Sequence, residues 1–476
     1  MNTIHNIIKN FSALSIAQLS SLLLGLILSV YIARVLGDVD FGQFSFAIAF
    51  VSLFAIFSDL GYNTLIIREV ARDKSKANAY LNNVLSLRIL LCFFIYIMII
   101  LSVNFLNYPF ESKNLVYVFG ASVLIDSLAD VFNVLFRAFE KMEYEATTAV
   151  YYSLAKISIG LLVLHLGYGL LSLGLVFIIL SIFRFYRLFS ICKKSFLNPK
   201  LRFDLEFWKR TLIIALPFSM TGISLLIYTR TDTVMLSYMK GDAAVGWYNA
   251  AYNLILSFKP IPQIFMNTLF PLMAGSFLTS KDMFNEICEI SFKFLILLGL
   301  PLTMGIFMLS DKIIYLIYGY QFSNSIIALR ILSFDIILFF IWTHLAFVLI
   351  NIDRQKLWLF AAITTAFINI ILNLYLIPSY SYIGSSVATI ISEMLCIIIL
   401  LFFIFRKTKL SLDYNSMLKI AISTMMMMIF IYAFKELNIY LLIFISIFIY
   451  SLSAYSIGAI SREEINIIRK GAKIGK

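Results

Sequence analysis

Charged residues are scarce in this sequence. Asp, Glu, Lys and Arg make up 13% of its 476 residues, about half the share found in ordinary soluble domains. Hydrophobic residues make up 61%, and this excess excludes a soluble globular protein. The formal net charge is +12, a surplus that can indicate nucleic-acid binding. Here the positions of the charges, in loops between apolar runs, indicate a membrane and no nucleic acid as the partner.

Cysteine and histidine are also few, and neither is clustered. The four cysteines form no CxxC pair and have no neighbouring histidine, so the sequence indicates neither a zinc site nor a disulfide framework. The three histidines lie far apart and lack the spacing of metal ligands. We therefore expect no metal site and no resident cofactor. These residues are Cys92, Cys192, Cys288, Cys396, His5, His165 and His344.

Long apolar runs take up most of the chain. Each must form a helix, because a backbone in lipid has to satisfy its hydrogen bonds within its own segment, and the runs lack the alternation of a membrane barrel. The sequence thus predicts an all-α integral membrane protein with about 14 transmembrane helices. The runs lie near residues 11–33, 41–60, 84–106, 114–137, 146–166, 168–190, 211–237, 244–273, 290–309, 325–350, 357–377, 382–405, 414–434 and 439–460.

The distribution of Lys and Arg predicts the orientation of these spans. With both termini in the cytoplasm, 27 of the 38 basic residues fall on the inside, five on the outside and six within or beside spans. We therefore expect a multi-pass protein of the cell membrane, plasma or inner. The longest basic stretch, residues 184–210, is assigned to the inside. It is explained by anchoring on anionic lipid, with docking of a cytoplasmic partner enzyme as the open alternative.

A short motif occurs twice, at residues 37–47 and 241–251, and both copies read G-D-x-x-(F/V)-G-x-(aromatic)-x-x-A. Six predicted spans separate the copies, so both have the same orientation, as in a parallel repeat. We expect two six-helix lobes followed by two C-terminal helices. The predicted parts are an N-terminal lobe at 1–190, a basic cytoplasmic linker at 191–210, a C-terminal lobe at 211–406, and two helices with a basic cytoplasmic tail at 407–476.

The residues around this motif resemble a known family. Segments 32–37, 41–42, 59–61 and 68–72 look like the opening of Wzx-type polysaccharide repeat-unit flippases, which belong to the multidrug, oligosaccharidyl-lipid and polysaccharide exporter superfamily. In the second half, segments 216–217, 230–236 and 245–252 are similar to the seventh and eighth helices of that family. The resemblance covers most of residues 10–405, whereas residues 406–476 match by hydropathy alone.

This resemblance implies a transporter and not an enzyme. The expected function is translocation of a polyprenyl-(di)phosphate-linked oligosaccharide from the inner to the outer leaflet by alternating access, for surface polysaccharide biosynthesis. Two alternatives from the same superfamily stay open, a multidrug or cation antiporter and a lipid II flippase. A membrane glycosyltransferase or polymerase is disfavoured, because the predicted external loops are short and hold no acidic pair beyond Asp38 and Asp40. If the basic stretch docks a partner enzyme, the resemblance implies an enzyme of polysaccharide biosynthesis, and the oligomeric state is left open.

Basic residues within spans are the candidates for binding an anionic headgroup. A charge at mid-helix costs about 2.5–3.5 kcal/mol on insertion scales, so such residues are expected to face a cavity. Lysine serves phosphate as a point charge and arginine as a planar fork. The alternative for each is an ion pair or a side chain that snorkels to water. The candidates are Arg88, Lys156, Arg230, Lys259 and Lys293, and the resemblance adds Arg34, because lipid II flippases use the matching arginine for headgroup binding.

Acidic and aromatic residues supply further candidates. If H⁺ or Na⁺ is coupled to transport, the carboxylates that would take it up are Asp126, Asp232 and Glu393. Aromatic walls for sugars, with packing as the alternative, are offered by Tyr151, Tyr152, Tyr228, Trp247, Tyr248 and Tyr252. Prolines permit kinks where moving parts would help. They stand at Pro217, Pro260, Pro262, Pro271 and Pro301.

Overall fold

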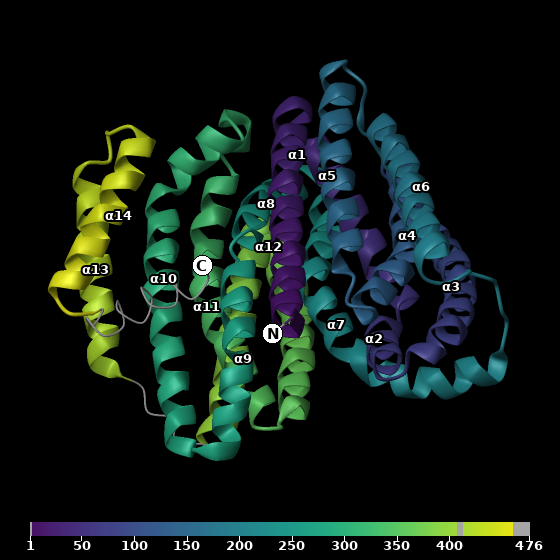
Figure 1. The fold of residues 1–476 in the computed structure, drawn as a ribbon. Helices are drawn as coiled ribbons and strands as arrows, with labels where there is room; N and C mark the ends of the chain where they lie inside the picture. The colour runs from purple at the N-terminus through teal and green to yellow at the C-terminus, as the bar shows by residue number, and fades with distance from the viewer. Residues whose placement is uncertain (1, 407–412, 460–476) are drawn as a thin grey trace. The chain divides into compact units, whose positions relative to one another are not determined.

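The computed structural model describes residues 2–406 and 413–459, and their side chains from residue 17 on except Thr221. The described residues form helices and connecting turns, with no β-strand among them (Figure 1). The α-helices are α1 (Asn2–Ala55), α2 (Tyr62–Arg72), α3 (Ala77–Phe105), α4 (Phe110–Ala138), α5 (Met142–His165), α6 (Leu170–Ser195), α7 (Leu205–Lys240), α8 (Asp242–Leu256), α9 (Pro260–Thr279), α10 (Lys281–Ile317), α11 (Ser325–Asn351), α12 (Gln355–Phe405), α13 (Tyr414–Ala433) and α14 (Ile439–Ser456). The 3₁₀ turns are η1 (Ile56–Ser58), η2 (Lys74–Lys76) and η3 (Tyr320–Phe322).

Eleven helices of the described chain are long and apolar enough to cross a membrane, or twelve if the bent α7 is one span. Two of them contain a kink at which two helices meet, at Gly37 in α1 and at Ser381 in α12. A straight 51-residue α12 would measure about 76 Å, far more than the roughly 30 Å of a bilayer core. Dividing both helices at their kinks adds two spans, which gives thirteen, or fourteen with the bent α7, in agreement with the prediction of about 14.

Polar caps and special backbone angles set the ends of these helices. Asp204, Ser280 and Asp413 each accept a hydrogen bond from a backbone N–H in the first turn of α7, α10 and α13, respectively. Such caps satisfy donors that the helix itself leaves unpaired. Gly37 ends the first half of α1 at a φ of 87°, a left-handed value that favours glycine. Residues at the helix ends themselves therefore determine where one apolar helix stops and the next begins.

The helices group into two compact units. We call the N-terminal unit the described residues up to Ala250 together with Asn373–Tyr382, and the C-terminal unit Ala251–Leu372 together with the described residues from Ile383 on. The units are defined by which helices pack together. Helix α7 belongs to the N-terminal unit because it lies against α1. The lobe boundaries at 190 and 211 follow the sequence repeat and stay a prediction. The predicted basic tail at 460–476 lies outside the described residues.

Within the N-terminal unit, α4 packs along α6 and an aromatic cluster fills the space between them. Phe132 contacts Phe185 and Phe189, and Phe136 contacts Phe196. In the C-terminal unit, α13 and α14 lie side by side and α13 packs on α10 (Figure 1). The Tyr450 hydroxyl of α14 donates to the Leu297 carbonyl of α10 at 2.7 Å. The last two helices are therefore attached to the C-terminal unit by specific contacts.

Candidate functional site

The two units divide the predicted cations between them. The N-terminal unit contains Arg34, Arg88, Lys156 and Arg230, and the C-terminal unit contains Lys259 and Lys293. Arg88, Lys156 and Lys259 are in ion pairs with carboxylates. Ion pairing was the alternative that the sequence left open for each cation.

Arg88 is held by three protein groups through its two terminal nitrogens. Its guanidinium is buried and donates to the Asp59 carboxylate at 2.5 Å and to the Asn63 side-chain oxygen at 3.0 Å. It also donates to the Ser127 carbonyl of α4 at 3.1 Å. Arg88, on α3, thus binds one carboxylate and two neutral acceptors. These contacts connect α3 with α2, with α4 and with the residue that follows η1. This geometry favours a structural role for Arg88 over contact with a substrate.

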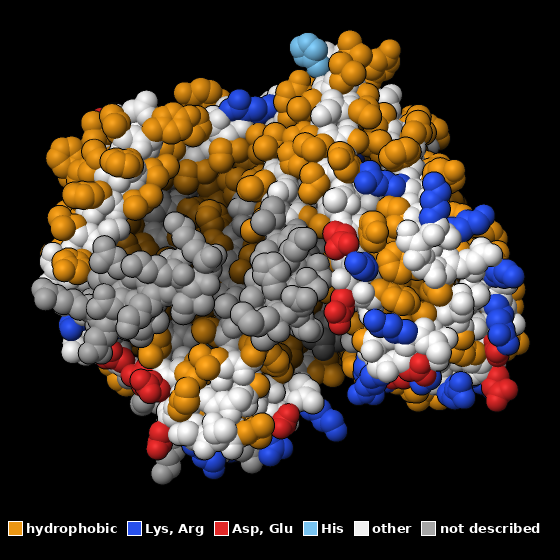
Figure 2. Space-filling model, in the orientation of Figure 1, with side chains coloured by type: hydrophobic (Ala, Val, Ile, Leu, Met, Phe, Trp, Pro, Cys, Tyr) orange, Lys and Arg blue, Asp and Glu red, His pale blue; other side chains and the backbone are white. Residues whose placement is uncertain are grey.

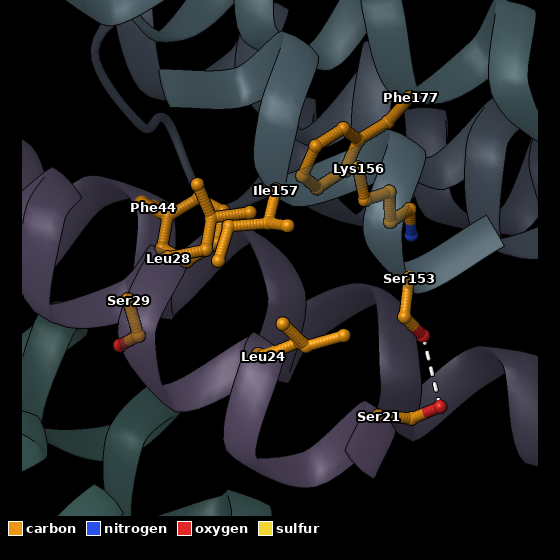
Figure 3. Close-up of a pocket in the computed structure, with 10 residues that line it drawn as sticks. Ser21, Leu24, Leu28, Ser29, Phe44, Ser153, Lys156, Ile157 and Phe177 are labelled. Atoms are coloured by element: carbon orange, nitrogen blue, oxygen red, sulfur yellow. Dashed lines mark hydrogen bonds between the residues drawn. The ribbon is translucent and has the colours of Figure 1, made fainter. Parts of the chain in front are cut away.

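Lys156 lies on a cavity of about 200 Å³ in the N-terminal unit. Figure 3 shows its side chain beside Phe177, near the hydrogen bond that Ser153 donates to Ser21 at 2.9 Å. The ammonium group is 4.3 Å from the centre of the Phe177 ring and 4.6 Å from that of Tyr152, which are cation–π distances. The cavity walls come from α1, α5 and α6 and include Leu24, Gly25, Leu28, Ser29, Phe44 and Ile157.

A cluster of alternating charges borders this cavity. The Arg184 guanidinium of α6 contacts the Asp126 carboxylate at 3.0 Å and the Asp130 carboxylate at 2.5 Å. The Tyr152 hydroxyl donates to Asp126 at 2.7 Å, whereas the Lys156 ammonium is 3.9 Å from that carboxylate. Two carboxylates face two cations, so the cluster is balanced. Because Asp126 is already held by Arg184 and Tyr152, Lys156 is its most loosely bound partner and faces the cavity.

Arg184 was missed by the sequence analysis. The sequence analysis counted it with the inside basic stretch, whereas the structure shows that it lies within α6 and reaches two carboxylates of α4. The signal available in the sequence was that Asp126 and Asp130 are four residues apart and so lie on one face of a helix. That spacing indicates that a cation from a neighbouring helix can contact both carboxylates.

Asp232 lies in a second polar network of the N-terminal unit. It is buried and accepts hydrogen bonds from the Tyr248 hydroxyl at 2.8 Å and the Asn373 side-chain amide at 2.7 Å. Asn373 had not been considered from the sequence. Two of the proposed sugar-wall aromatics therefore have structural partners, because Trp247 likewise donates to Asp38 at 2.7 Å. In contrast, Tyr151 is 59% exposed, with the Arg187 guanidinium over its ring.

The two copies of the repeated motif contact each other. Gly37 and Gly241 adopt nearly the same backbone angles, with φ of 87° and 83° and ψ of −176° and −178°. A Cβ placed on Gly42 would overlap the Asp242 carbonyl, and one placed on Gly246 would overlap the Asp38 carbonyl. The contact is thus reciprocal, each copy placing a glycine against the backbone of the other. Only residues without a side chain permit this approach.

Lys293, on α10, is half-buried and lies near the start of α13. Hydrogen bonds from Ser416 hold the pKa of the Asp413 carboxyl below its usual value, and the Lys293 charge contributes to that shift. Lys293 thus contributes to the electrostatics of a helix end, and Lys259 contacts Asp335 and Glu393.

The fold defines the class of protein. The chain resembles the structure entitled "Lipid II flippase MurJ, inward closed conformation", with a TM-score of 0.77, 19% identity and coverage of 95% of this chain and 99% of that one. The protein is therefore a multi-pass membrane protein with the MurJ-like helical fold.

Comparison of sequences gives the family. Residues 7–277 match the family model described as "Polysaccharide biosynthesis protein", and the chain belongs to this family. It is 21% identical over 400 residues to the "Capsular polysaccharide biosynthesis protein CapF" of Staphylococcus aureus, covering 82% of this chain and 97% of CapF. It is 22% identical over 428 residues to the "Probable low-salt glycan biosynthesis flippase Agl15" of Haloferax volcanii, covering 88% of each. The family predicted from the sequence motifs is confirmed.

Proposed function

We propose that the protein is a flippase that moves a polyprenyl-(di)phosphate-linked oligosaccharide from the inner to the outer leaflet of the cell membrane. Membership of the polysaccharide biosynthesis family and similarity to a relative named as a glycan biosynthesis flippase support this proposal. A membrane potential that is negative inside favours outward movement of the anionic headgroup by about 2.3 kcal/mol per charge per 100 mV. The protein then acts as a transporter, with no covalent change to the lipid.

The observation that carries the proposal is the Lys156 cavity. Its volume of about 200 Å³ is below the roughly 300–1,000 Å³ of pockets that enclose a whole drug-sized ligand. It suits one phosphate group with part of a sugar, while the polyprenyl chain stays in lipid. The ammonium group supplies the charge for a phosphate, and Ser21, Ser29 and Ser153 supply hydroxyls for its oxygens or for a sugar.

A flipping assay on the full chain tests this function. Proteoliposomes carry a polyprenyl-diphosphate-linked disaccharide with a fluorescent sugar, and an impermeant quencher reports the label that reaches the outer surface. We expect time-dependent quenching of the inner pool, absent from protein-free vesicles, and intact lipid on mass analysis. A lengthened or shortened glycan would instead support the enzyme alternative, and export of a lipophilic cation without flipping would support the drug antiporter.

The proposed orientation places the basic end of the N-terminal unit in the cytoplasm. On the face shown in Figure 2, Lys and Arg side chains gather toward the lower right, over α6 and the start of α7. The residues of this stretch include Arg187, Lys193, Lys194, Lys200, Arg202, Lys209 and Arg210. Anionic lipid on the cytoplasmic leaflet attracts such residues.

Cysteine labelling tests this orientation. The four native cysteines are buried, so the background reaction with an impermeant maleimide should be low. Tyr168→Cys, in the exposed α5–α6 turn, should react in intact cells, whereas Lys74→Cys, between α2 and α3, should react only after permeabilisation. The reverse pattern would place the termini outside and contradict the proposed direction of transport.

A further inference from the structure

The cavity that contains Lys156 reaches the backbone of α1 at Gly25. Gly25 lines this cavity together with Ser21 and Ser29. The three residues follow one another at intervals of four along α1, so they lie on one face of the helix. A Cβ placed on Gly25 would meet no side chain and no neighbouring helix of the described residues within 4 Å. The cavity wall is therefore open at Gly25, between two side chains that carry hydroxyls.

Helix packing does not account for a glycine at this position. A glycine within a helix is less favourable than an alanine, because it loses more backbone freedom on folding. Gly160 of α5 shows the case in which packing compensates for this loss. A Cβ on Gly160 would lie 3.1 Å from Cδ1 of Leu28 and 3.2 Å from Cδ1 of Leu173, so the missing side chain admits two neighbours. At Gly25 the missing side chain leaves clear only the space of the cavity.

The two sides of the cavity differ in chemistry. Lys156 lies on α5, and Ser21, Leu24 and Ser29 lie across the cavity on α1 (Figure 3). The lining residues of α1 offer hydroxyls and hydrocarbon but no charge. A phosphate is recognised best by a cation, whereas a sugar presents hydroxyls and C–H surfaces that suit an uncharged wall. A phosphate held by Lys156 would therefore place the sugar attached to it toward α1.

We propose that Gly25 lies against the first sugar of the lipid-linked oligosaccharide and limits the size of that sugar. The inference rests on the proposed flippase function and on the phosphate contact of Lys156. A side chain at residue 25 would occupy the space of the sugar, and such a clash discriminates by excluding the larger ligand. The ammonium on the opposite wall would stay in place. Gly25 is then a specificity-determining residue for the sugar, and Lys156 binds the phosphate.

Binding of two radiolabelled lipids to the purified full chain in nanodiscs tests this division. One lipid is polyprenyl diphosphate without a sugar, and the other is polyprenyl diphosphate linked to N-acetylglucosamine. We expect Gly25→Leu to weaken binding of the sugar-bearing lipid by roughly 10-fold or more, and binding of the sugar-free lipid by less than about 2-fold. Lys156→Gln should weaken binding of both lipids, because both carry the diphosphate.

The matched control is Gly275→Leu, the same substitution at an exposed helical glycine of α9 outside the cavity. This variant should bind both lipids as the wild type does, and monodisperse gel filtration verifies that each variant is folded. Unchanged binding of both lipids by folded Gly25→Leu, or an equal loss of both, would overturn the assignment of Gly25 to the sugar. A wild type that binds neither lipid would contradict the proposed function itself, which is a distinguishable result.

Gly25→Ala gives a finer test, because its methyl group fills less of the cavity than a leucine side chain. The quenching assay is performed with two lipids whose first sugar is either glucose or the larger N-acetylglucosamine. We expect Gly25→Ala to slow flipping of the second lipid more than flipping of the first, relative to the wild type. A merely structural effect of the substitution would slow both equally, and an unchanged ratio of the two rates would overturn the limit on sugar size.

Discussion

Flipping of the lipid-linked sugar should fall roughly 10-fold to 100-fold when Lys156 is replaced by glutamine. The variant keeps most of the side-chain volume on the cavity wall but removes the ammonium group that faces it. Hydrogen bonds to charged groups contribute about 1.5–3 kcal/mol each, which corresponds to this loss if the ammonium contacts a phosphate. The measurement is the quenching assay in proteoliposomes, performed at substrate concentrations below and above saturation to separate binding from turnover.

Two further lysine variants separate charge from packing. Lys156→Arg keeps the positive charge beside Phe177 and Tyr152 and should retain more activity than Lys156→Gln. Lys74→Gln removes a charge from an exposed position outside the cavity and should flip as the wild type does. If folded Lys156→Gln flips at the wild-type rate, the cavity is not the headgroup site and the residue serves only to balance Asp126.

The second large effect is expected at the reciprocal contact between the two copies of the repeated motif. Gly42→Ala and Gly246→Ala each place a methyl group where the other copy has a backbone carbonyl, so the two copies must separate. If closure of this contact is a step of alternating access, either variant should lose most transport while folding normally. The quenching assay measures transport, and accessibility of Val39→Cys, an exposed position just after the Gly37 kink, to maleimide should increase in the same variants.

Gly275→Ala is the matched control, because a Cβ on that helical glycine of α9 would meet nothing within 4 Å. It should transport at the wild-type rate. Normal transport by both Gly42→Ala and Gly246→Ala would mean that the contact is dispensable, and its proposed role in alternating access would be abandoned.

The membrane fold could be predicted from the sequence because its determinants are local. Apolar runs of about 20 residues, the breaks between them and the repeated glycine motif each depend on neighbouring residues. The structure agrees with these predictions even where two spans join directly, as at Gly37 and Ser381. Span number and loop positions were therefore accessible without knowledge of packing.

The partners of the buried charges could not be predicted in the same way. Helices that are apolar on every side give no periodic signal for the face that meets a neighbour. Arg88 and Asp59 are 29 residues apart, and Lys259 meets Asp335 and Glu393 from two other helices. Arg184 was not considered as a site residue for the same reason, because its position near the end of a span gave no indication that it reaches α4. The rotation of each helix about its axis decides these contacts.

The return of Asn373–Tyr382 to the N-terminal unit limits how the gene could be divided. A fragment cut after residue 250 would lack the amide of Asn373 that holds Asp232, and the Pro378 carbonyl that accepts from the Lys240 ammonium at 2.6 Å. Neither piece would then be an autonomous folding module, because one would lack this segment of α12 and the other would carry it without the residues that it binds. Evolution by exchange of whole halves between relatives is correspondingly constrained, since this ten-residue segment would have to be inherited with the half that binds it.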